Sequence, residues 1–334
     1  MEVKITAAQV NELRKATGVG MMDCKKALVE AEGDFEKAVD LLRKKGQKVA
    51  AKRADRAANE GRVIAKVNAD STKAYILVMG CETDFVAKNE EFVALNEKII
   101  NEAMAHDINT LEELLNYTFD GMTVSEHLIQ LTGKTGEKLE IPAYNVLSAP
   151  HVTAYNHNGN RLGVIAGFNM PGFEETTHEV ALQIAAMNPA ALSADNISEE
   201  TKAHELAVII EKTKADEIAK AVENAIRKAG INPAHVDSDD HIESNMKKGW
   251  ITPEQAQQAR EIKVKATEEA TANLDKQAKK IEMISQGRLQ KYYKENTLLA
   301  QEYYGDSKMN VAEFMKKANA ELTCTAYYRL QLGD

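Results

Sequence analysis

The chain has 334 residues and a formal net charge of −9, and 44% of its residues are hydrophobic and 28% charged. This length allows two or more domains, and the composition excludes a wholly disordered chain. The negative charge argues against a general nucleic-acid-binding protein, which needs a positive field to displace counterions from phosphates. No apolar run approaches the roughly 20 residues that cross a bilayer. The segment Met1–Thr6 also lacks the pattern of a signal peptide.

The cysteines Cys24, Cys81 and Cys324 are far apart and form no Cys-x-x-Cys pair. An odd number of widely spaced cysteines predicts reduced thiols in a cytoplasmic protein. The same spacing argues against a disulfide framework and against a zinc site.

Residues 1–46 show the periodicity of three short helices separated by glycine-containing turns. Their apolar positions are Val10 and Leu13, then Met21, Cys24, Leu28 and Ala31, then Phe35, Ala38, Val39 and Leu42. Helices of this size bury little surface, so we expect a minimal domain. The basic stretch after Gly46 is predicted to be its tether, which places the domain and tether at residues 1–56. A solvated helix face or linker and a contact with RNA or an acidic partner both remain open for this stretch.

A hairpin followed by a helix then occurs twice. The first copy has strand-like runs at 62–67 and 74–79 and a helix with Phe92, Leu95, Ile99 and Ala103 on one face; the second has runs at 152–155 and 161–168, a turn at 156–159 and a helix from Glu174 to Met187. This repetition predicts an α+β core built from two similar halves. We place the halves at residues 57–148 and 149–197, with residues 286–334 continuing the second.

Residues 198–285 have an almost wholly helical pattern. One helix is predicted from Glu199 to Lys228, and another begins at Thr252 with Pro253 in its first position. The second helix is expected to continue without a break past Leu274, so the two form a protruding antiparallel helical hairpin or coiled coil. A short helix at 311–322 and a closing strand at 323–330 follow.

A search for catalytic motifs supports no enzyme, cofactor or metal site. The chain has no His-Glu-x-x-His pair, no phosphate-binding loop, no Gly-x-Gly-x-x-Gly after a strand and no Gly-x-Ser-x-Gly turn. Residues 237–240 resemble the start of a calcium loop, but Ile242 stands where glycine is needed and Lys248 where the bidentate glutamate should be. We therefore interpret them as a polar loop tip.

Two segments are informative for binding. Residues 13–28 form a helix, a glycine turn and a second helix that starts with Met21 and Met22. Adjacent residues cannot both face one core, so at least one methionine should be exposed or only partly covered. Methionine suits adaptable contact surfaces, although core packing remains the simpler explanation.

Residues 81–89 connect a strand to a helix, a position where exposed side chains are rigidly presented. In one interpretation Thr83 or Asp84 caps the helix, and Phe85 joins the buried stripe of Phe92 and Ile99. In the other, Phe85 protrudes as an aromatic anchor, with Asp84 beside it as a hydrogen-bond acceptor.

Together these segments resemble the two signature stretches of the bacterial elongation factor Ts family. The match covers residues 17–28 and 82–88, and it extends to 155–157, 161–164, 287–293 and the closing strand. The resemblance spans nearly the whole chain. It implies a ubiquitin-associated-like N-terminal domain, a two-part α+β core and a protruding helical hairpin.

The resemblance also implies a function, the release of GDP from elongation factor Tu so that GTP can replace it. Family members carry the aspartate and phenylalanine matching Asp84 and Phe85 into the nucleotide domain of that partner, where the aromatic ring wedges between two helices. The partner-binding residues that the resemblance implies are Thr83, Asp84, Phe85, Val86, Arg14, Met21, Met22, Lys25 and His157.

The chain departs from the family pattern at several positions. Val78 and Gly80 stand where Glu and Asn are usual, Thr135 replaces an apolar residue, and the usual Pro and Val are missing around residues 301–305. The helical hairpin is also longer than in many members. An RNA- or ribosome-associated adaptor is the alternative function, because of the basic tether and the long hairpin.

Overall fold

The computed structural model describes residues 4–157 and 159–333. Asn158, in the predicted second turn, lies outside the described residues, as do Met1–Val3 and Asp334. The chain divides into two compact units. The core unit contains the segments up to Leu192 and from Glu302 onward, and the hairpin unit is Ser193–Gln301. The finer division into five segments stays a prediction.

The core unit begins with the three predicted helices, α1 (Ala7–Thr17), α2 (Met21–Glu30) and α3 (Phe35–Lys52). They share a small apolar core to which Leu13, Cys24, Leu28 and Ala38 contribute. Gly18 ends α1 in the left-handed conformation, with φ of 66°, which glycine adopts without a steric penalty. The likeness of this domain to ubiquitin-associated domains stays a prediction.

Helix α3 corrects one expectation, because it continues through Gly46 and most of the basic stretch predicted to be a tether. Gly46 lies where α3 crosses α7 (Val124–Thr135), facing Gly133. A Cβ atom added at Gly133 would lie 3.1 Å from the Cα of Gly46. The glycine therefore permits close helix packing here and does not end the helix.

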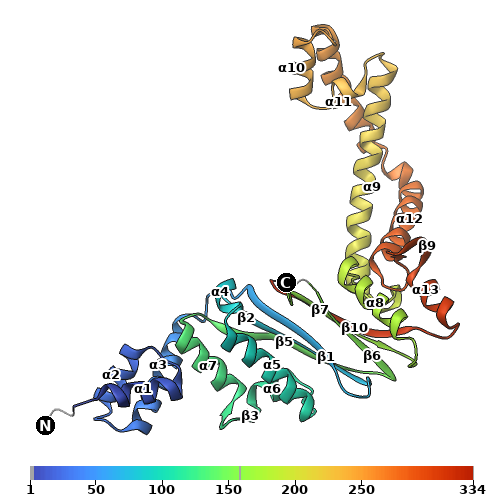
Figure 1. The fold of residues 1–334 in the computed structure, drawn as a ribbon. Helices are drawn as coiled ribbons and strands as arrows, with labels where there is room; N and C mark the ends of the chain where they lie inside the picture. Colours follow the sequence, from blue (N-terminus) through green and yellow to red (C-terminus); the bar gives the residue numbers. More distant parts are fainter. Residues whose placement is uncertain (1–3, 158, 334) are drawn as a thin grey trace. The chain divides into compact units, whose positions relative to one another are not determined.

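The first sheet has the strand order β1-β2-β5 and is antiparallel, with β1 at Glu60–Val67, β2 at Lys73–Cys81 and β5 at Leu139–Ser148. The sequence patterns predicted the β1–β2 hairpin but missed β5. Helices α5 (Glu90–Ala105), α6 (Leu111–Asn116) and α7 cover one face (Figure 1). The small strands β3 (Thr118–Phe119) and β4 (Met122–Thr123) join α6 to α7.

The second sheet has the order β10-β7-β6 and is also antiparallel, with β6 at His151–His157, β7 at Leu162–Phe168 and β10 at Cys324–Gln331. Helix α8 (Glu174–Met187) follows the hairpin as predicted. The small strands β8 (Glu302–Tyr303) and β9 (Asp306–Asn310) precede α13 (Val311–Ala318) in the chain, and α13 packs against α8. The two sheets share an apolar layer that includes Val63, Ile76, Val152 and Ile165. The α+β class is confirmed.

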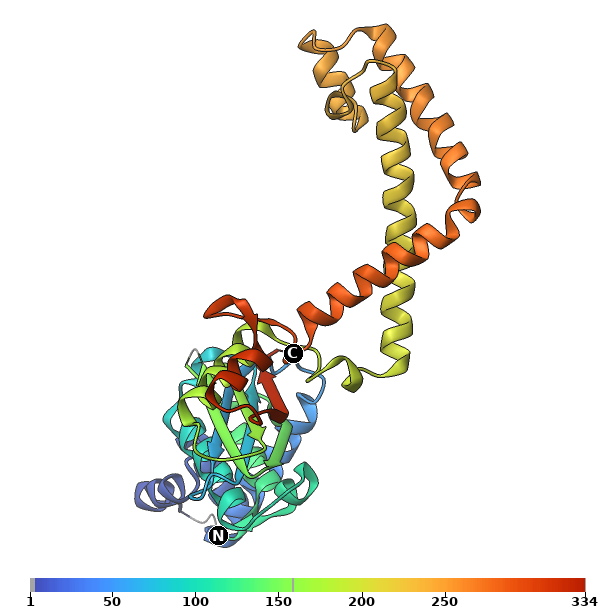
Figure 2. The ribbon, with the colours of Figure 1, turned by 90° about the vertical axis from the view of Figure 1, so that its right-hand side faces the viewer.

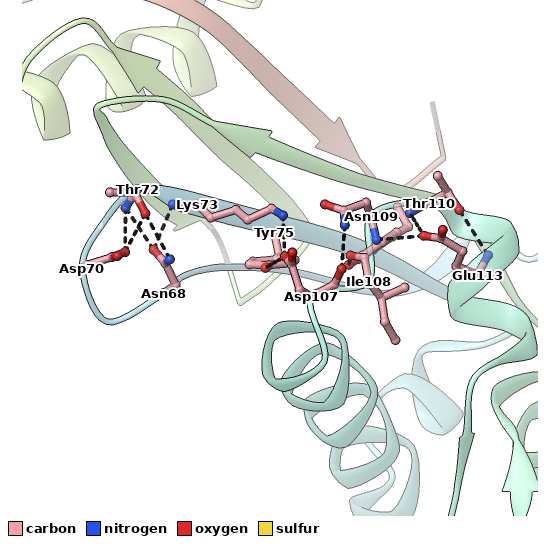
Figure 3. Close-up of polar contacts among 11 residues, drawn as sticks. Asn68, Asp70, Thr72, Lys73, Tyr75, Asp107, Ile108, Asn109, Thr110 and Glu113 are labelled. Atoms are coloured by element: carbon pink, nitrogen blue, oxygen red, sulfur yellow. Dashed lines mark hydrogen bonds and ion pairs between the residues drawn. The ribbon is translucent and has the colours of Figure 1, made fainter.

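The α5–α6 connection is held to the first sheet by a polar network (Figure 3). Asp107 accepts hydrogen bonds from the Lys73 ammonium and, at 3.0 Å, from the Tyr75 hydroxyl. The Lys73 and Tyr75 donors hold the pKa of Asp107 below its usual value. Tyr144 also donates to the carbonyl of Ile108 at 2.7 Å. These bonds fix a loop to a strand, so we assign the network a structural role.

The hairpin unit has α9 (Glu199–Lys228) on one side and α11 (Pro253–Ala272) and α12 (Ala278–Asn296) on the other. The prediction of one unbroken second helix is wrong, because the 3₁₀ turn Asp275–Gln277 separates α11 from α12 (Figure 2). The predicted polar loop tip is also wrong in part, since Ser238 caps a further helix, α10 (Asp239–Lys247). The short turns Ala194–Asn196 and Pro233–His235 complete the unit. No helix in the described ranges is long and apolar enough to cross a bilayer.

Candidate partner-binding surface

The turn that follows β2 presents Phe85 to solvent. It forms α4 (Asp84–Ala87), a helix of a single turn. Ala87 is buried and Val86 packs partly against the apolar core, whereas Phe85 is 83% exposed. The interpretation of Phe85 as a member of the buried stripe is therefore wrong, whereas Phe92 and Ile99 contribute to the core as expected.

The turn is held in place by residues far away in the sequence. Thr83 donates from its backbone N–H to Glu137 Oε2 at 3.0 Å and from its hydroxyl to Glu137 Oε1 at 2.7 Å. Glu82 accepts from the backbone N–H of Lys138 at 2.7 Å and from Arg53 Nη1 at 2.8 Å. The residues before Asp84 are therefore anchored from two directions, by the segment after α7 and by the end of α3.

Asp84 is a half-exposed carboxylate beside Phe85. Its Oδ2 lies 2.6 Å from the ammonium of Lys88, one helical turn later. The hydrogen bond from Lys88 is the main reason why the pKa of Asp84 lies below its usual value. Asp84 is thus a charged acceptor at neutral pH, with lone pairs available to a further donor.

The glycine turn at the start of α2 presents a second group of exposed side chains. Met21 is 51% exposed and Met22 is 64% exposed. The interpretation of these methionines as core residues is therefore wrong. Arg14 and Lys25 are also exposed. The side chain of Lys134 lies over Gly18 and its ammonium reaches Glu91 at 3.0 Å. Helix α7 therefore connects the glycine turn to the start of α5, just after the turn at residues 82–88, which we call the signature turn.

His157 lies at the exposed end of β6, and its Nδ1 is 2.6 Å from the hydroxyl of Tyr155. The backbone N–H of Arg161 donates to the carbonyl of His157, and the Arg161 side chain forms an ion pair with Glu60 at 2.5 Å. Glu60 is paired in the sheet with Cys81, the last residue before the signature turn. The hydrogen bond to Glu60 is the main reason that the pKa of Arg161 is raised, and the charge of Asp84 adds to it. His157 and Asp84 therefore both lie near the ion pair of Arg161 with Glu60.

Sequence reasoning missed the aromatic lining next to His157. A surface pocket there is lined by Tyr155, His157, Leu182, Ala185, Ala186 and Tyr304. Tyr303 and Tyr304 both donate to Glu179. The adjacent tyrosines in the sequence were the only available signal, and nothing local links them to β6.

The described residues contain no cluster of three or more His, Cys, Asp or Glu side chains arranged to hold a metal ion. Cys24, Cys81 and Cys324 are buried, and none of them forms a disulfide. Burial raises the pKa of Cys81 and of Cys324 to about 12, which keeps both as unreactive thiols. The distinctive chemistry of this surface is thus an exposed aromatic ring, exposed methionines and charged groups around them.

A braced turn carrying an exposed aromatic anchor is typical of a protein that acts by binding another protein. The comparisons with known proteins agree with this class. Residues 82–334 match the family model described as "Elongation factor TS". The chain is 49% identical over 329 residues to elongation factor Ts of Parabacteroides distasonis, covering 98% of each chain. It is 48% identical over 329 residues to that of Bacteroides fragilis, again with 98% of each chain covered.

A more distant relative gives the same result, since the chain is 41% identical over 332 residues to elongation factor Ts of Christiangramia forsetii, covering 99% of each. The chain belongs to the elongation factor Ts family. Its role is nucleotide exchange in translation elongation, and the alternative of an RNA- or ribosome-associated adaptor is not favoured.

Proposed function

We propose that the chain binds elongation factor Tu in its GDP-bound and nucleotide-free forms, in the cytoplasm, and promotes release of GDP so that GTP can bind. In this proposal it holds no nucleotide, metal or cofactor and catalyses no covalent step. The observation that carries the proposal is the exposure of Phe85 on a turn anchored at Thr83 and Glu82.

Exchange requires that the factor and GDP weaken each other's binding to the partner by the same ratio. Weakening GDP by about a thousandfold requires roughly 4 kcal/mol of interface free energy directed into distortion of the nucleotide site. Complete burial of one phenylalanine contributes about 1.5–3 kcal/mol. Phe85 can therefore supply a large share, and the rest falls to other contacts.

We assign the remaining contacts to the exposed groups that border this turn. Asp84 offers a charged acceptor beside the ring. Thr83 and Val86 complete the turn, and the N-terminal helices contribute Arg14, Met21, Met22 and Lys25. His157 contributes from the second half-core. Because Val86 packs partly against the core, its contact should be the smallest of those in the turn.

The experiment is release of fluorescent GDP from purified elongation factor Tu at fixed magnesium, with substoichiometric amounts of the chain. We expect the unmodified chain to accelerate GDP release. Phe85→Ala should reduce this acceleration about tenfold or more, because loss of a ring contact of about 1.5–3 kcal/mol corresponds to that ratio. Circular dichroism should show an unchanged fold, because Phe85 contributes little to the core.

The matched control is Met283→Ala, which removes a side chain that is 71% exposed on α12, outside the proposed contact residues. It should leave the release rate unchanged. Equal activity of Phe85→Ala and the unmodified chain would contradict the wedge role of Phe85. Failure of the folded, unmodified chain to accelerate release at all would contradict the proposed function.

A further inference from the structure

The anchor of the signature turn lies 54 residues away in the sequence, at the start of the segment between α7 and β5. Helix α7 ends at Gly136, which is left-handed with φ of 74°, and Glu137 follows immediately. This abrupt end turns the chain so that both carboxylate oxygens of Glu137 reach Thr83, at 3.0 Å and 2.7 Å. Only glycine adopts this backbone conformation at no steric cost.

The contact is reciprocal between two pairs of consecutive residues. Glu137 accepts the backbone N–H of Thr83, and Glu82 accepts the backbone N–H of Lys138. Arg53 then donates to both oxygens of Glu82, at 2.8 Å each. Hydrogen bonds to ionised carboxylates are stronger than neutral ones and constrain direction as well as distance. These bonds thus fix the position of residues 82–83 relative to residues 137–138.

The turn needs such an external anchor. Helix α4 has four residues, and Thr83 at its N-cap makes no side-chain capping bond within the helix; its hydroxyl donates to Glu137 instead. A single helical turn is not stable by itself, since nucleation costs more than it returns. Phe85 adds no core packing, because it is exposed. Burial of Ala87 and Val86 holds the C-terminal side of the turn, and the contacts at Thr83 and Glu82 hold its N-terminal side, directly before Phe85.

We propose that Glu137 is a positioning residue for nucleotide exchange, which holds Thr83 so that Phe85 projects in its binding orientation in the free protein. The inference rests on the proposed function. Ordering a loop in advance removes an entropic cost from binding. Loss of Glu137 should therefore weaken association with the partner more than it slows exchange within the formed complex, because the partner can still impose the orientation once it is bound.

The test measures GDP release from elongation factor Tu over a range of concentrations of the full chain. Glu137→Gln should raise the half-saturating concentration about tenfold, the ratio expected for one charge-assisted hydrogen bond, with a nearly unchanged maximal rate. Hydrogen exchange of the free protein should also be faster at the amides of Thr83, Asp84 and Phe85. A role limited to overall stability would change neither the half-saturating concentration nor this local exchange.

The matched control is Glu113→Gln. Glu113 also accepts backbone N–H groups, those of Asn109 and Thr110 at 3.1 Å each, in the capping box of α6. It should lower thermal stability comparably and leave the half-saturating concentration unchanged. If both variants raised the half-saturating concentration equally, the effect would not be specific to the signature turn and the positioning role would be overturned.

Thr83→Val provides a second, milder variant, since it removes the hydroxyl and keeps the backbone bond to Glu137. The double variant with Glu137→Gln should be little worse than Glu137→Gln alone, because the hydroxyl bond that Thr83→Val removes is one of the two bonds that Glu137→Gln already weakens. Additive effects would overturn the proposal. If Glu137→Gln fails to fold, a wild-type half-saturating concentration for Thr83→Val would overturn it.

Phe85→Ala separates this inference from the proposed function. Loss of exchange for Phe85→Ala, together with unchanged kinetics for Glu137→Gln and Thr83→Val, would overturn only the positioning role. Unchanged exchange for Phe85→Ala would remove the premise that this turn acts as the wedge.

Discussion

Phe85 has the highest exposed fraction among the large hydrophobic side chains that the structure describes. Such a ring contributes little to the free fold, and its burial against a partner would release about 1.5–3 kcal/mol. Its neighbours show how the surface is maintained. Val86 and Ala87 face the protein, while Thr83 and Glu82 are engaged by distant polar groups. The residues that hold the turn are thus different from the residue that the turn presents.

Glu82 makes the stability of this region depend on pH. The hydrogen bond from the backbone N–H of Lys138, with help from Arg53, lowers the pKa of Glu82 from its ordinary value of 4.5. A carboxylate with a lowered pKa in the folded state stabilises the fold above its ordinary pKa. That contribution disappears as the pH falls through the lowered value.

We therefore expect Glu82→Gln to be less stable than the unmodified chain at pH 7, and the difference to narrow as the pH falls below about 4.5. Urea unfolding at several pH values measures it. The control Glu12→Gln, at an exposed position of α1, should follow the unmodified chain. A difference in stability that stays constant from neutral to acid pH would contradict this role of the Glu82 charge.

At the scale of elements, the crossing of α3 and α7 joins the N-terminal helices to the rest of the core unit. Gly46 and Gly133 face each other there, and a Cβ at Gly46 would lie 3.1 Å from the carbonyl oxygen of Ile129. Close backbone approach lets α3 bring Arg53 to Glu82 and lets α7 place Glu137 at Thr83. The packing at the helix crossing therefore helps to position the two side chains that hold the signature turn.

Gly133→Val should disturb this crossing, because the added side chain meets the backbone of α3. Overpacking of this kind costs about 1–3 kcal/mol. We expect a lower melting temperature and faster trypsin cleavage between α3 and β1, where Arg53 and Arg56 lie. The control is Gly287→Val in α12, where a Cβ meets nothing within 4 Å. Equal behaviour of the two variants would show that the crossing tolerates the added volume.

At the scale of the whole molecule, the two units have separate apolar cores. The hairpin unit has a cluster that joins the end of α9 to α10 and the start of α11, formed by Ile226, Ile231, Val236, Ile242, Ile251, Ala256 and Ala259. The core unit has clusters on both faces of its first sheet. Units with separate cores need not unfold together, so a single free energy of unfolding is not expected to describe this chain.

Calorimetry should accordingly resolve two unfolding transitions. Ile242 is fully buried in the hairpin unit, and Ile242→Ala should cost about 2–5 kcal/mol there. We expect it to lower only one of the two transition temperatures and to leave the other unchanged. A single transition that shifts as a whole would show that the units unfold cooperatively.

Local patterns in the sequence predicted much of this architecture. The helix from Glu174 to Met187 and the helix from Glu199 to Lys228 were predicted with the bounds that the structure shows. Both hairpins were predicted as well. Each of these elements has a regular apolar period and a clear stop signal, which are properties of neighbouring residues. The resemblance to the elongation factor Ts family came from short stretches of sequence, and the comparisons confirmed it.

Other features depended on contacts between distant residues. Gly46 resembles a helix stop in the sequence and is a helix contact in the structure, because Gly133 approaches it. The strand β5 was missed because its partner β2 lies more than 50 residues earlier, and a single strand acquires its hydrogen bonds only from that partner. The break between α11 and α12 was also missed, since apolar residues continue on both sides of it.

The sequence by itself determined the three N-terminal helices, α5, α8, α9, both hairpins, the family and the two signature stretches, because these are recorded in local periodicity and short motifs. Only the tertiary structure decided that Phe85 is exposed, since its spacing fits a buried stripe equally well. The tertiary structure also decided which groups hold the turn. Glu137 reaches the turn because α7 ends just before it, and Arg53 reaches it because α3 crosses α7. These contacts join residues far apart in the sequence, so no local sequence pattern predicts them.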